Sequence, residues 1–410
     1  MHKFLTVVLL CVLIAAQKTE WDSPENLHIY RNFRKWILYN FGGDQLQRPT
    51  RYRLEHLQKQ LPPDVPFPCN VAGGRSAKVP DSVHRLRPGD IDVVAAMGDS
   101  ITAGNGIFAM NLMQVLIENR GAAASIGGQG NWRTYLTLPN ILKEFNPNLI
   151  GYSLGDTYTS NPDSQFNVAE FAAMAKDMPF MARYLVDRMK QDPRVNIKKH
   201  WKLISILIGH NDLCNEVCVA PTPSSILETY RSDLVNTLRI LRNNLPRTFV
   251  VVTTMFSLNR YVDVMKTQPI LRCYIMTRFF CPCLFGLQYQ DRISEYYDMI
   301  KRWQEVEEEV ISYPEFNRED FTVVLSPVLQ SMSAPLTEDG RPDFTQVSID
   351  CFHPSQKVNA RYANGLWNSL LEPVGKRSSE SRLEYERFLC PTPEKPFLMT
   401  RENSQEGWEK

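Results

Sequence analysis

Short apolar runs alternate along this chain with longer segments of helical periodicity. The runs with the length and composition of buried β-strands are residues 91–97, 122–126, 149–152, 203–208, 249–254 and 321–325. The segments with helical periodicity are residues 169–189, 224–244, 292–311 and 356–371. Strands that alternate with helices form parallel sheets covered on both faces. The predicted fold is therefore a three-layer α/β/α sandwich with a mainly parallel sheet.

One large domain accounts for most of the chain. The 410 residues are 43% hydrophobic, which is enough apolar material for a sizeable core. No internal repeat or long Gly/Ser linker divides them, and we expect the core over residues 91–375. Residues 20–90, rich in Pro, Arg and aromatic residues, are expected to pack on that core as an N-terminal extension. Residues 376–410 are expected to form a C-terminal extension.

The N-terminus predicts export. Lys3 precedes an unbroken apolar run over residues 4–16 that ends in small residues. This pattern is typical of a cleaved secretory signal peptide, here approximately residues 1–19, and the run is shorter than the roughly 20 residues that span a bilayer. The C-terminus is polar. We therefore expect a secreted protein without a C-terminal membrane anchor.

Eight cysteines follow the predicted signal peptide, and an even number in an exported chain predicts disulfides. They are Cys69, Cys214, Cys218, Cys273, Cys281, Cys283, Cys351 and Cys390. Eight cysteines allow 105 pairings, which the sequence leaves open. Cys214 and Cys218 lie four apart and Cys281 and Cys283 two apart, but no histidine or further cysteine stands at zinc-finger spacing around these two pairs, so no metal is expected. With 46 Lys and Arg against 45 Asp and Glu the net charge is +1, and no nucleic-acid partner is expected.

A serine follows the first predicted strand directly. The strand IDVVAAM runs into GDSITAG, so Ser100 stands where a strand passes to a helix. Backbone N–H groups at such a junction can point at a developing oxyanion. Ser100 is therefore a candidate nucleophile, although a serine at a strand end can also serve only as a helix N-cap.

A serine hydroxyl needs a base before it can attack an ester. His353 stands in the sequence Asp350-Cys351-Phe352-His353, before a helical segment. A carboxylate three residues before a histidine can reach Nδ1 across a tight turn and leave Nε2 free for Ser100. The alternative is a surface histidine with a chance aspartate nearby.

Two further blocks offer oxyanion donors. Asn211, in Gly209-His210-Asn211-Asp212, follows the predicted strand 203–208 and can aim its amide NH₂ at an oxyanion, although Asn-Asp is also common in turns. Gly128, in Ser-Ile-Gly-Gly, follows residues 122–126 and can offer a backbone N–H without side-chain obstruction. Four such blocks in compatible order are unlikely to coincide by chance.

Three other residues are candidates for a role in the site. Ser153 lies in a G-x-S-x-G pattern, but the residues after it, DTYTSNPDSQ, are typical of turns rather than of the helix that this motif requires. His210 is interpreted as a wall or surface histidine, because the carboxylate beside it in sequence, Asp212, is expected to point away. Asp99 is interpreted as a structural hydrogen-bonding residue of the turn.

The blocks GDSITAGNG, SIGG, GHND and DCFH together resemble those of the GDSL (SGNH) hydrolases. The chain is more closely similar to the animal phospholipase B group. The stretches that carry this likeness are VHRLRPGDIDVVAAMGDSITAGNG, TLPNILKEFNPNLIGYSLG, GHNDLC, DCFHPSQK, LWNSLLEPVG and CPTPEKPFL, from about residue 69 to 399. His210 departs from the family pattern, in which glycine is more usual.

The resemblance implies roles for the residues already selected. Ser100 would be the nucleophile, His353 the general base and Asp350 the residue that orients it. The oxyanion hole would comprise the Ser100 N–H, the Gly128 N–H and the Asn211 side chain. No cofactor or metal is implied.

The substrates implied by the resemblance are phospholipids and lysophospholipids, both of whose acyl esters would be cleaved, with transient contact to a lipid aggregate or membrane surface. Two alternatives stay open. One is a short-chain or carbohydrate esterase of the same fold, and the other is a catalytically silent lipid-binding protein.

Overall fold

The computed structural model describes residues 24–42, 54–267, 270–331, 336–337, 339–380, 383–405 and 407–408. The predicted signal peptide lies outside the described residues. Five strands form one sheet in the described chain, namely β1 (Ile91–Gly98), β2 (Trp201–Leu207), β3 (Thr248–Thr253), β4 (Asn317–Arg318) and β5 (Phe321–Ser326). Their order is β1-β2-β3-β5-β4, and every neighbouring pair is parallel except β4 with β5. The four long strands are almost wholly buried, as expected of a parallel sheet with both faces covered.

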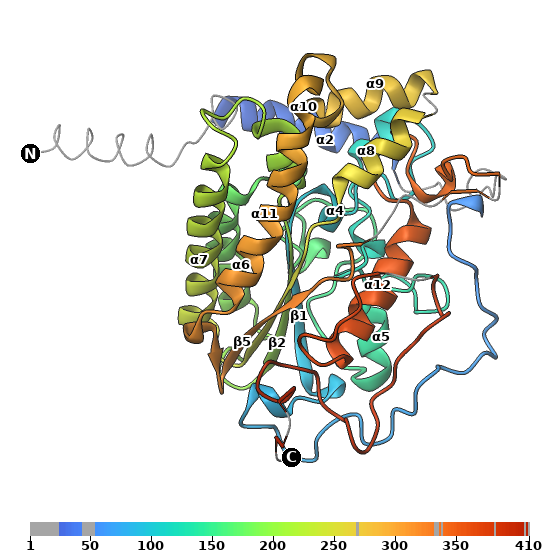
Figure 1. The fold of residues 1–410 in the computed structure, drawn as a ribbon. Coiled ribbons are helices and arrows are strands. Elements are labelled where there is room, and N and C mark those ends of the chain that lie inside the picture. The colour runs from blue at the N-terminus through green and yellow to red at the C-terminus, as the bar shows by residue number, and fades with distance from the viewer. Residues whose placement is uncertain are drawn as a thin grey trace, which may run out of the picture.

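Helices cover both faces of this sheet (Figure 1). The α-helices are α2 (Pro24–Phe41), α4 (Ser100–Ala103), α5 (Leu138–Phe145), α6 (Met178–Gln191), α7 (Ser225–Asn244), α8 (Leu258–Thr267), α9 (Leu271–Phe280), α10 (Pro282–Phe285), α11 (Ile293–Ile311) and α12 (Gln356–Leu371). Helices α6, α7 and α11 pack on one face of the sheet, and α5 and α12 pack on the other. The predicted three-layer α/β/α sandwich is confirmed.

The alternation of side chains along β1 builds the two halves of the core. Val93 and Met97 point into the cluster formed with α6, α7 and α11. Val94 and Ala96 point into the cluster formed with α5 and α12. Successive residues of a strand face opposite sides of the sheet, so one apolar run supplies both layers.

Two predicted strands are not strands. Residues 122–126 begin at the last residue of the 3₁₀ turn η6 (Arg120–Ala122) and continue in turns. Residues 149–152 meet β1 through a single bridge between Val93 and Ile150. Both segments are largely buried. Their apolar character therefore reflects burial, which periodicity alone does not distinguish from strand structure in so short a run.

The predicted helix 169–189 begins later than expected, because α6 starts at Met178. Side chains from the GHND block hold the preceding segment in a non-helical form. The Asn211 Nδ2 donates to the Ala173 carbonyl oxygen at 2.9 Å, and the Ala175 N–H donates to the Asp212 carboxylate at 3.1 Å. These contacts replace helical hydrogen bonds and tie residues 173–175 to the end of β2.

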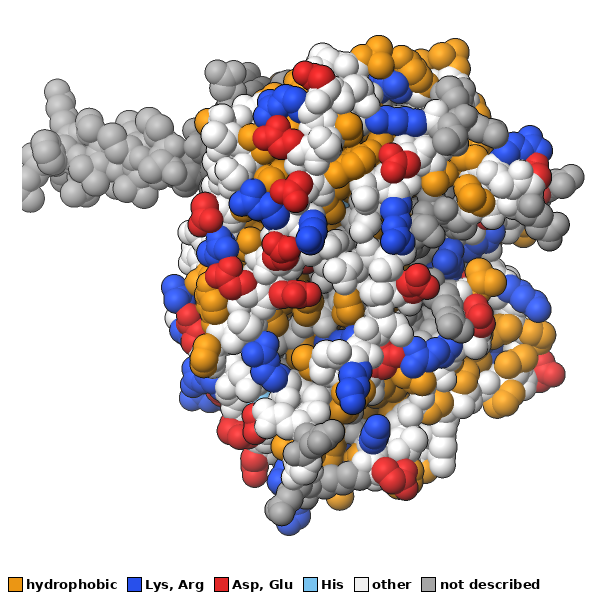
Figure 2. Space-filling view, in the orientation of Figure 1, with side chains coloured by type: hydrophobic (Ala, Val, Ile, Leu, Met, Phe, Trp, Pro, Cys, Tyr) orange, Lys and Arg blue, Asp and Glu red, His pale blue; other side chains and the backbone are white. Residues whose placement is uncertain are grey.

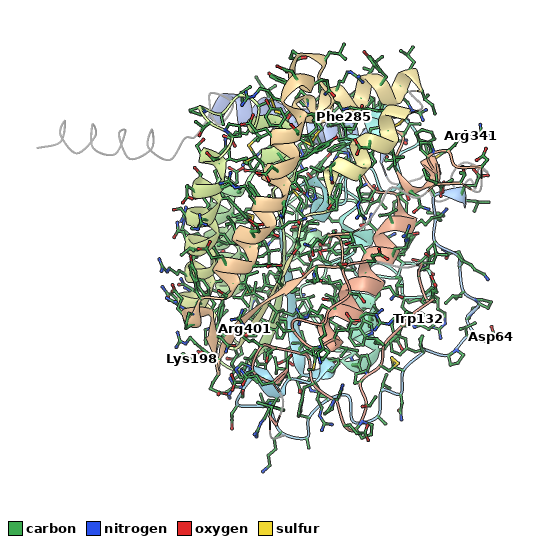
Figure 3. The ribbon with its side chains drawn as sticks, in the orientation of Figure 1. Asp64, Trp132, Lys198, Phe285, Arg341 and Arg401 are labelled. Carbon is green, nitrogen blue, oxygen red and sulfur yellow. A yellow bond between two sulfur atoms is a disulfide. The ribbon has the colours of Figure 1, made fainter. Side chains whose placement is uncertain are left out.

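The segment 20–90 contains a helix, α2, that no pattern in the sequence predicted. The Arg34 guanidinium on α2 pairs with the buried Glu118 carboxylate and lies 3.2 Å from that of Glu170. Further along, the Cys69–Cys390 disulfide joins the regions before and after the core. Figure 3 shows Phe285 of α10 at the end of the molecule opposite Lys198 and Arg401. The end with α10 is the one to which the carboxyl ends of the parallel strands point.

Candidate active site

Ser100 is the first residue of α4, immediately after β1. Gly98 allows this passage, because a Cβ there would lie 2.3 Å from the Leu207 carbonyl oxygen of the neighbouring strand, and its φ is +155°. The Asp99 side chain caps α4 by accepting the Ile101 N–H at 2.9 Å. The strand end and the cap together fix the backbone from which the Ser100 hydroxyl projects.

The structure brings Ser100, His353 and Asp350 into one chain of hydrogen bonds. The Ser100 Oγ lies 2.9 Å from Nε2 of His353, and the Nδ1 of His353 lies 2.5 Å from an oxygen of the Asp350 carboxyl group. An ionised carboxylate can only accept, so the imidazole proton is on Nδ1 and Nε2 accepts from the serine hydroxyl. All three side chains are buried, and Ser100 is 5% exposed. This geometry suits general-base activation of the serine.

The electrostatics of the pair favour an ionised Asp350. Burial alone would raise the pKa of its carboxyl group, but the charge and hydrogen bond of His353 outweigh that effect and lower the pKa below its ordinary value. The backbone N–H groups of Phe352 and His353 contribute in the same direction, donating to its other oxygen at 3.0 and 3.1 Å.

The loop that carries this pair is held from outside its own sequence. Cys351 has φ of +56°, a left-handed conformation that lets the chain turn sharply between Asp350 and His353. Its side chain forms a disulfide with Cys273 of α9, and its carbonyl oxygen accepts from the Tyr261 hydroxyl of α8. Two helices thus fix the position of the loop that carries Asp350 and His353.

The three proposed oxyanion donors differ in availability. The Ser100 N–H stands at the first position of α4, where an N–H has no intrahelical acceptor. One N–H of the Asn211 amide donates to Ala173, which leaves the other for a ligand. The Gly128 N–H donates to the Ser153 carbonyl oxygen at 2.9 Å, so a contact from Gly128 to an oxyanion would require that bond to break.

His210 and Ser153 have structural partners. His210 is 3% exposed, so it is a buried histidine and not a surface one. Its Nδ1 lies 3.2 Å from the Asp99 carboxylate, a partner distant in sequence, while Asp212 instead accepts the Ala175 N–H. The hydroxyl of Ser153 donates to the Ser164 carbonyl oxygen at 2.9 Å, which gives it no base.

A family model matches residues 94–366, a span that contains the whole Ser100–His353 constellation, and its description is GDSL-like lipase/acylhydrolase. The chain belongs to this family. The resemblance drawn from the sequence blocks is thereby confirmed.

Curated relatives of this GDSL-like chain are mammalian proteins named "Phospholipase B1, membrane-associated". The chain is 38% identical to that of Mus musculus over 341 residues, which cover 81% of this chain and 23% of the relative. The corresponding values are 40% over 333 residues for Rattus norvegicus and 39% over 336 residues for Homo sapiens, each covering 80% of this chain and 22% of the relative. The chain therefore spans about a quarter of the length of these relatives.

Three phenylalanines that sequence reasoning missed surround the imidazole of this GDSL-like site. The rings of Phe171, Phe280 and Phe352 lie 6.1, 5.3 and 5.4 Å from that of His353. Phe352 stood inside the recognised DCFH block, so only its contact was unforeseen. Phe171 and Phe280 come from remote segments without a motif, and no local signal marks them.

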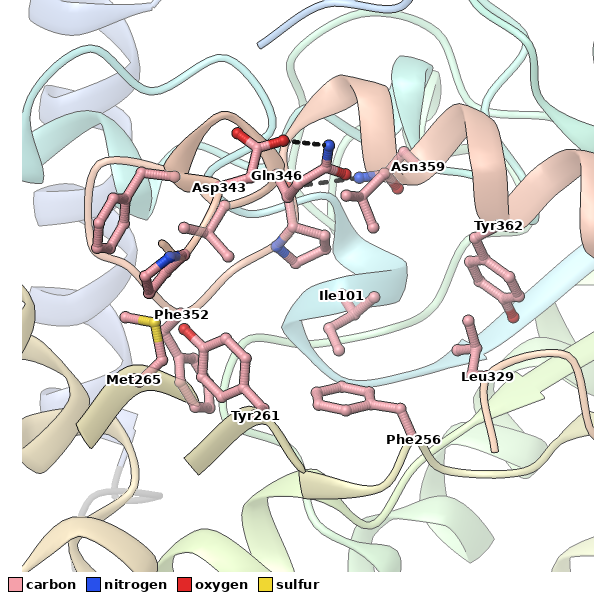
Figure 4. Close-up of a pocket in the computed structure, with 15 residues that line it drawn as sticks. Ile101, Phe256, Tyr261, Met265, Leu329, Asp343, Gln346, Phe352, Asn359 and Tyr362 are labelled. Carbon is pink, nitrogen blue, oxygen red and sulfur yellow. Dashed lines mark hydrogen bonds between the residues drawn. The ribbon is translucent and has the colours of Figure 1, made fainter. Parts of the chain in front are cut away.

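An apolar pocket adjoins Ser100 and His353 (Figure 4). Ile101, the residue after Ser100, projects into it, and Phe352 and Pro354 bring it beside His353. The other lining residues are mostly apolar, namely Phe256, Tyr261, Met265, Leu329, Pro342, Asp343, Phe344, Gln346, Val347, Val358, Asn359 and Tyr362. Its volume, open mouth included, is about 850 Å³, within the range typical of ligand pockets.

Two other features bear on the chemistry of the described residues. They contain no cluster of three or more His, Cys, Asp or Glu side chains arranged to hold a metal ion. Among them, too, no helix has the length and apolar character needed to cross a membrane.

Proposed function

We propose that this chain is a serine esterase that hydrolyses fatty-acyl esters of glycerophospholipids and lysophospholipids through an acyl-enzyme on Ser100. The observation that carries the proposal is the buried hydrogen-bond chain from Ser100 through His353 to Asp350, beside an apolar pocket. The family match supports ester chemistry, and the names of the curated relatives support a phospholipid substrate.

In the first half of the reaction, Nε2 of His353 takes the hydroxyl proton as Ser100 Oγ attacks the acyl carbonyl carbon. Asp350 stabilises the imidazolium and keeps its orientation. The Ser100 N–H and the free N–H of the Asn211 amide stabilise the oxyanion of the tetrahedral intermediate. The intermediate collapses with cleavage of the ester C–O bond, and Nε2–H gives its proton to the departing alcohol.

In the second half, water replaces the alcohol. His353 removes a proton from this water, whose oxygen attacks the acyl carbon on Ser100, and collapse returns the proton to the serine. A free fatty acid leaves. A lysophospholipid produced in a first cycle still carries an acyl ester and can enter a second one.

The pocket is the feature that favours a long acyl chain over an acetyl group. Apolar side chains dominate its lining, and two of its polar side chains pair with each other, since the Gln346 Nε2 donates to the Asp343 carboxylate at 2.8 Å. An acetyl group would leave most of that apolar surface exposed to water, whereas a fatty-acyl chain would cover it.

We also propose that the protein works in an oxidising compartment outside the cytosol. The eight described cysteines form four disulfides, Cys69–Cys390, Cys214–Cys281, Cys218–Cys283 and Cys273–Cys351. Disulfides persist in secreted proteins and are rare in the cytosol. Secretion itself, and the signal peptide over residues 1–19, stay predictions that N-terminal sequencing of the exported protein would test.

The test uses the full chain and a phosphatidylcholine with two different acyl chains, with Ser100→Ala alongside. Mass spectrometry follows fatty acids, lysophosphatidylcholine and glycerophosphocholine over time. We expect lysophosphatidylcholine and then glycerophosphocholine to form with the protein that retains Ser100 and not with Ser100→Ala. EDTA should not change the rate of product formation.

Absence of product from both proteins would overturn the phospholipase proposal. Short-chain and acetylated carbohydrate esters, with a fluorophosphonate probe of Ser100, would then distinguish a short-chain esterase from a silent lipid-binding protein. Hydrolysis by Ser100→Ala but not by Ser153→Ala would overturn the choice of nucleophile.

A further inference from the structure

Helix α9 exposes an apolar stripe. Leu271, Ile275 and Phe279 recur every four residues, which places them on one helical face, and they are 73%, 55% and 71% exposed. The opposite face carries Cys273 and Thr277, which are buried. An amphipathic helix on a protein surface ordinarily directs its apolar stripe inward, so this arrangement is reversed.

The chain segment that carries the stripe has only positively charged side chains. Residues 264–290 contain no aspartate or glutamate but include Lys266, Arg272 and Arg278. The Arg278 guanidinium stacks over the Tyr274 ring on the same helix, 3.4 Å from the ring centroid. An apolar stripe flanked by basic side chains is complementary to an apolar layer bordered by phosphate groups.

The same helix covers the candidate active site. Phe280, next to the exposed Phe279, has its ring 5.3 Å from that of His353 and 5.5 Å from that of Phe352. The stripe is therefore one side chain away from the catalytic imidazole. A molecule bound on α9 would meet the protein at the place where a substrate must enter.

Disulfides make this part of the molecule a fixed platform. Cys273 joins α9 to the catalytic loop at Cys351. Cys281, at the end of α9, joins Cys214 in the π-helical turn η9 (Asp212–Glu216), and Cys283 of α10 joins Cys218 just beyond it. The stripe thus keeps a constant position relative to both His353 and Asn211.

Other apolar side chains lie at the same end of the molecule. Figure 2 shows hydrophobic side chains gathered over α9 at the top of the view. Helix α2 lies at this end too (Figure 1), and it exposes Phe33 and Trp36, which are 43% and 51% accessible, beside the exposed cations Arg31 and Lys35. Aromatic rings beside cations are typical of segments that lie in a membrane interface.

We propose that the exposed face of α9 is the surface by which this protein docks on a phospholipid bilayer or aggregate, with Leu271, Ile275 and Phe279 inserted among the lipids. This inference rests on the proposed function, because it names the physical form in which that substrate is met. A second copy of the chain fits this face less well, since the basic side chains of two such faces would repel each other.

The test separates docking from catalysis. Vesicles of phosphatidylcholine with phosphatidylserine are sedimented with Ser100→Ala protein, which binds without turnover. The double variant Ile275→Ser/Phe279→Ser in this background is expected to bind about 100-fold more weakly, because two apolar side chains no longer leave water on binding. Val79→Ser is the matched control, because Val79 is 54% exposed, like Ile275, but lies at the opposite end of the sheet. Its neighbour Pro80 shows this position, since the Pro80 carbonyl oxygen accepts a hydrogen bond from Trp201 at the start of β2.

Activity gives the second readout, in protein that retains Ser100. At sub-saturating lipid, the double variant should hydrolyse vesicle phospholipid about 100-fold more slowly than the unmodified protein. It should hydrolyse a soluble monomeric butyrate ester at the unchanged rate, and that result would also show that the variant folds. Unchanged vesicle binding in the double variant, or equal loss in Val79→Ser, would overturn the docking proposal. Stripe-dependent binding without phospholipid hydrolysis would leave docking intact and refute the proposed function. If the protein does not bind vesicles but forms a dimer that the double variant cannot form, the face binds a second copy of the chain, and the docking proposal is overturned.

Discussion

Asp350→Asn is the substitution that tests the proposed chemistry most directly. One oxygen of the carboxyl group accepts the backbone N–H groups of Phe352 and His353 at 3.0 and 3.1 Å. The oxygen of an asparagine must stay at this position, because its NH₂ group cannot accept them. The NH₂ group is then directed at Nδ1 of His353, which the other carboxylate oxygen now contacts at 2.5 Å.

The consequence is a change of tautomer. An NH₂ group can only donate, so Nδ1 must become the acceptor and the imidazole proton moves to Nε2. Ser100 Oγ, 2.9 Å from Nε2, then faces an N–H and has no base. Loss of the correct tautomer in a Ser-His-Asp triad lowers kcat by about 10⁴-fold, equivalent to about 5 kcal/mol. The fold should persist, because each polar atom of the Ser100, His353 and residue 350 side chains keeps a hydrogen-bond partner in this variant.

The assay measures kcat on a soluble ester at pH 7 to 8 and thermal unfolding of the same samples. Ser100→Ala serves as the control for background hydrolysis. A folded Asp350→Asn protein with kcat within about tenfold of the unmodified protein would refute the tautomer argument. If the variant proves unstable, Asp350→Glu distinguishes the cases, because a carboxylate there restores the acceptor for Nδ1 and should recover part of kcat.

Two further predictions concern the structure around the site. Cys273→Ser/Cys351→Ser opens a disulfide that joins residues 78 apart, and should lower the free energy of unfolding in guanidinium by about 2–4 kcal/mol and also reduce kcat. Cys69→Ser/Cys390→Ser, the control, should lower the free energy of unfolding without changing kcat. Equal kcat values for the two double variants would contradict the assigned role of the Cys351 loop. Burial raises the pKa of Asp212 to about 8, so between about pH 4 and 8 the folded protein holds a proton that the unfolded chain has lost, and stability falls as pH rises through that window. The side chain in Asp212→Asn cannot ionise, and it keeps an acceptor for the Ala175 N–H. The melting temperature of this variant, measured from pH 5 to 9, should exceed that of the unmodified protein above pH 8. Identical pH profiles for the two proteins would show that Asp212 is not the titrating group.

The site residues that could be predicted are those whose chemistry is encoded locally. Ser100 was recognisable because a strand, a glycine and a helix start surround it within a few residues. His353 and Asp350 were recognisable because three residues and one tight turn separate them. In both cases the neighbours in sequence are also the neighbours in space, apart from the single long-range contact between Ser100 and His353.

The contacts that escaped prediction join segments with no local mark. Tyr261 and Phe280 belong to helices α8 and α9, whose sequences show no catalytic motif, and each contacts residues 351–353 from more than 70 positions away. Asp99 was correctly interpreted as a hydrogen-bonding residue of the turn, but its partner His210 was not foreseen. The Gly128 N–H was expected to be free, and its bond to Ser153 exists because residues 127 and 153 form an isolated bridge that no strand signal announced.

By itself the sequence determined the layers of this fold and singled out the residues of its candidate site. Apolar periodicity records whether each segment is buried on one face or two, and that information is local. The tertiary structure alone decided which of 105 cysteine pairings forms, that α9 faces His353 on one side and solvent on the other, and that the Ser100 hydroxyl reaches Nε2 of that histidine. The physical reason is that these contacts depend on the order and packing of whole elements, and no interaction between neighbours along the chain specifies that order.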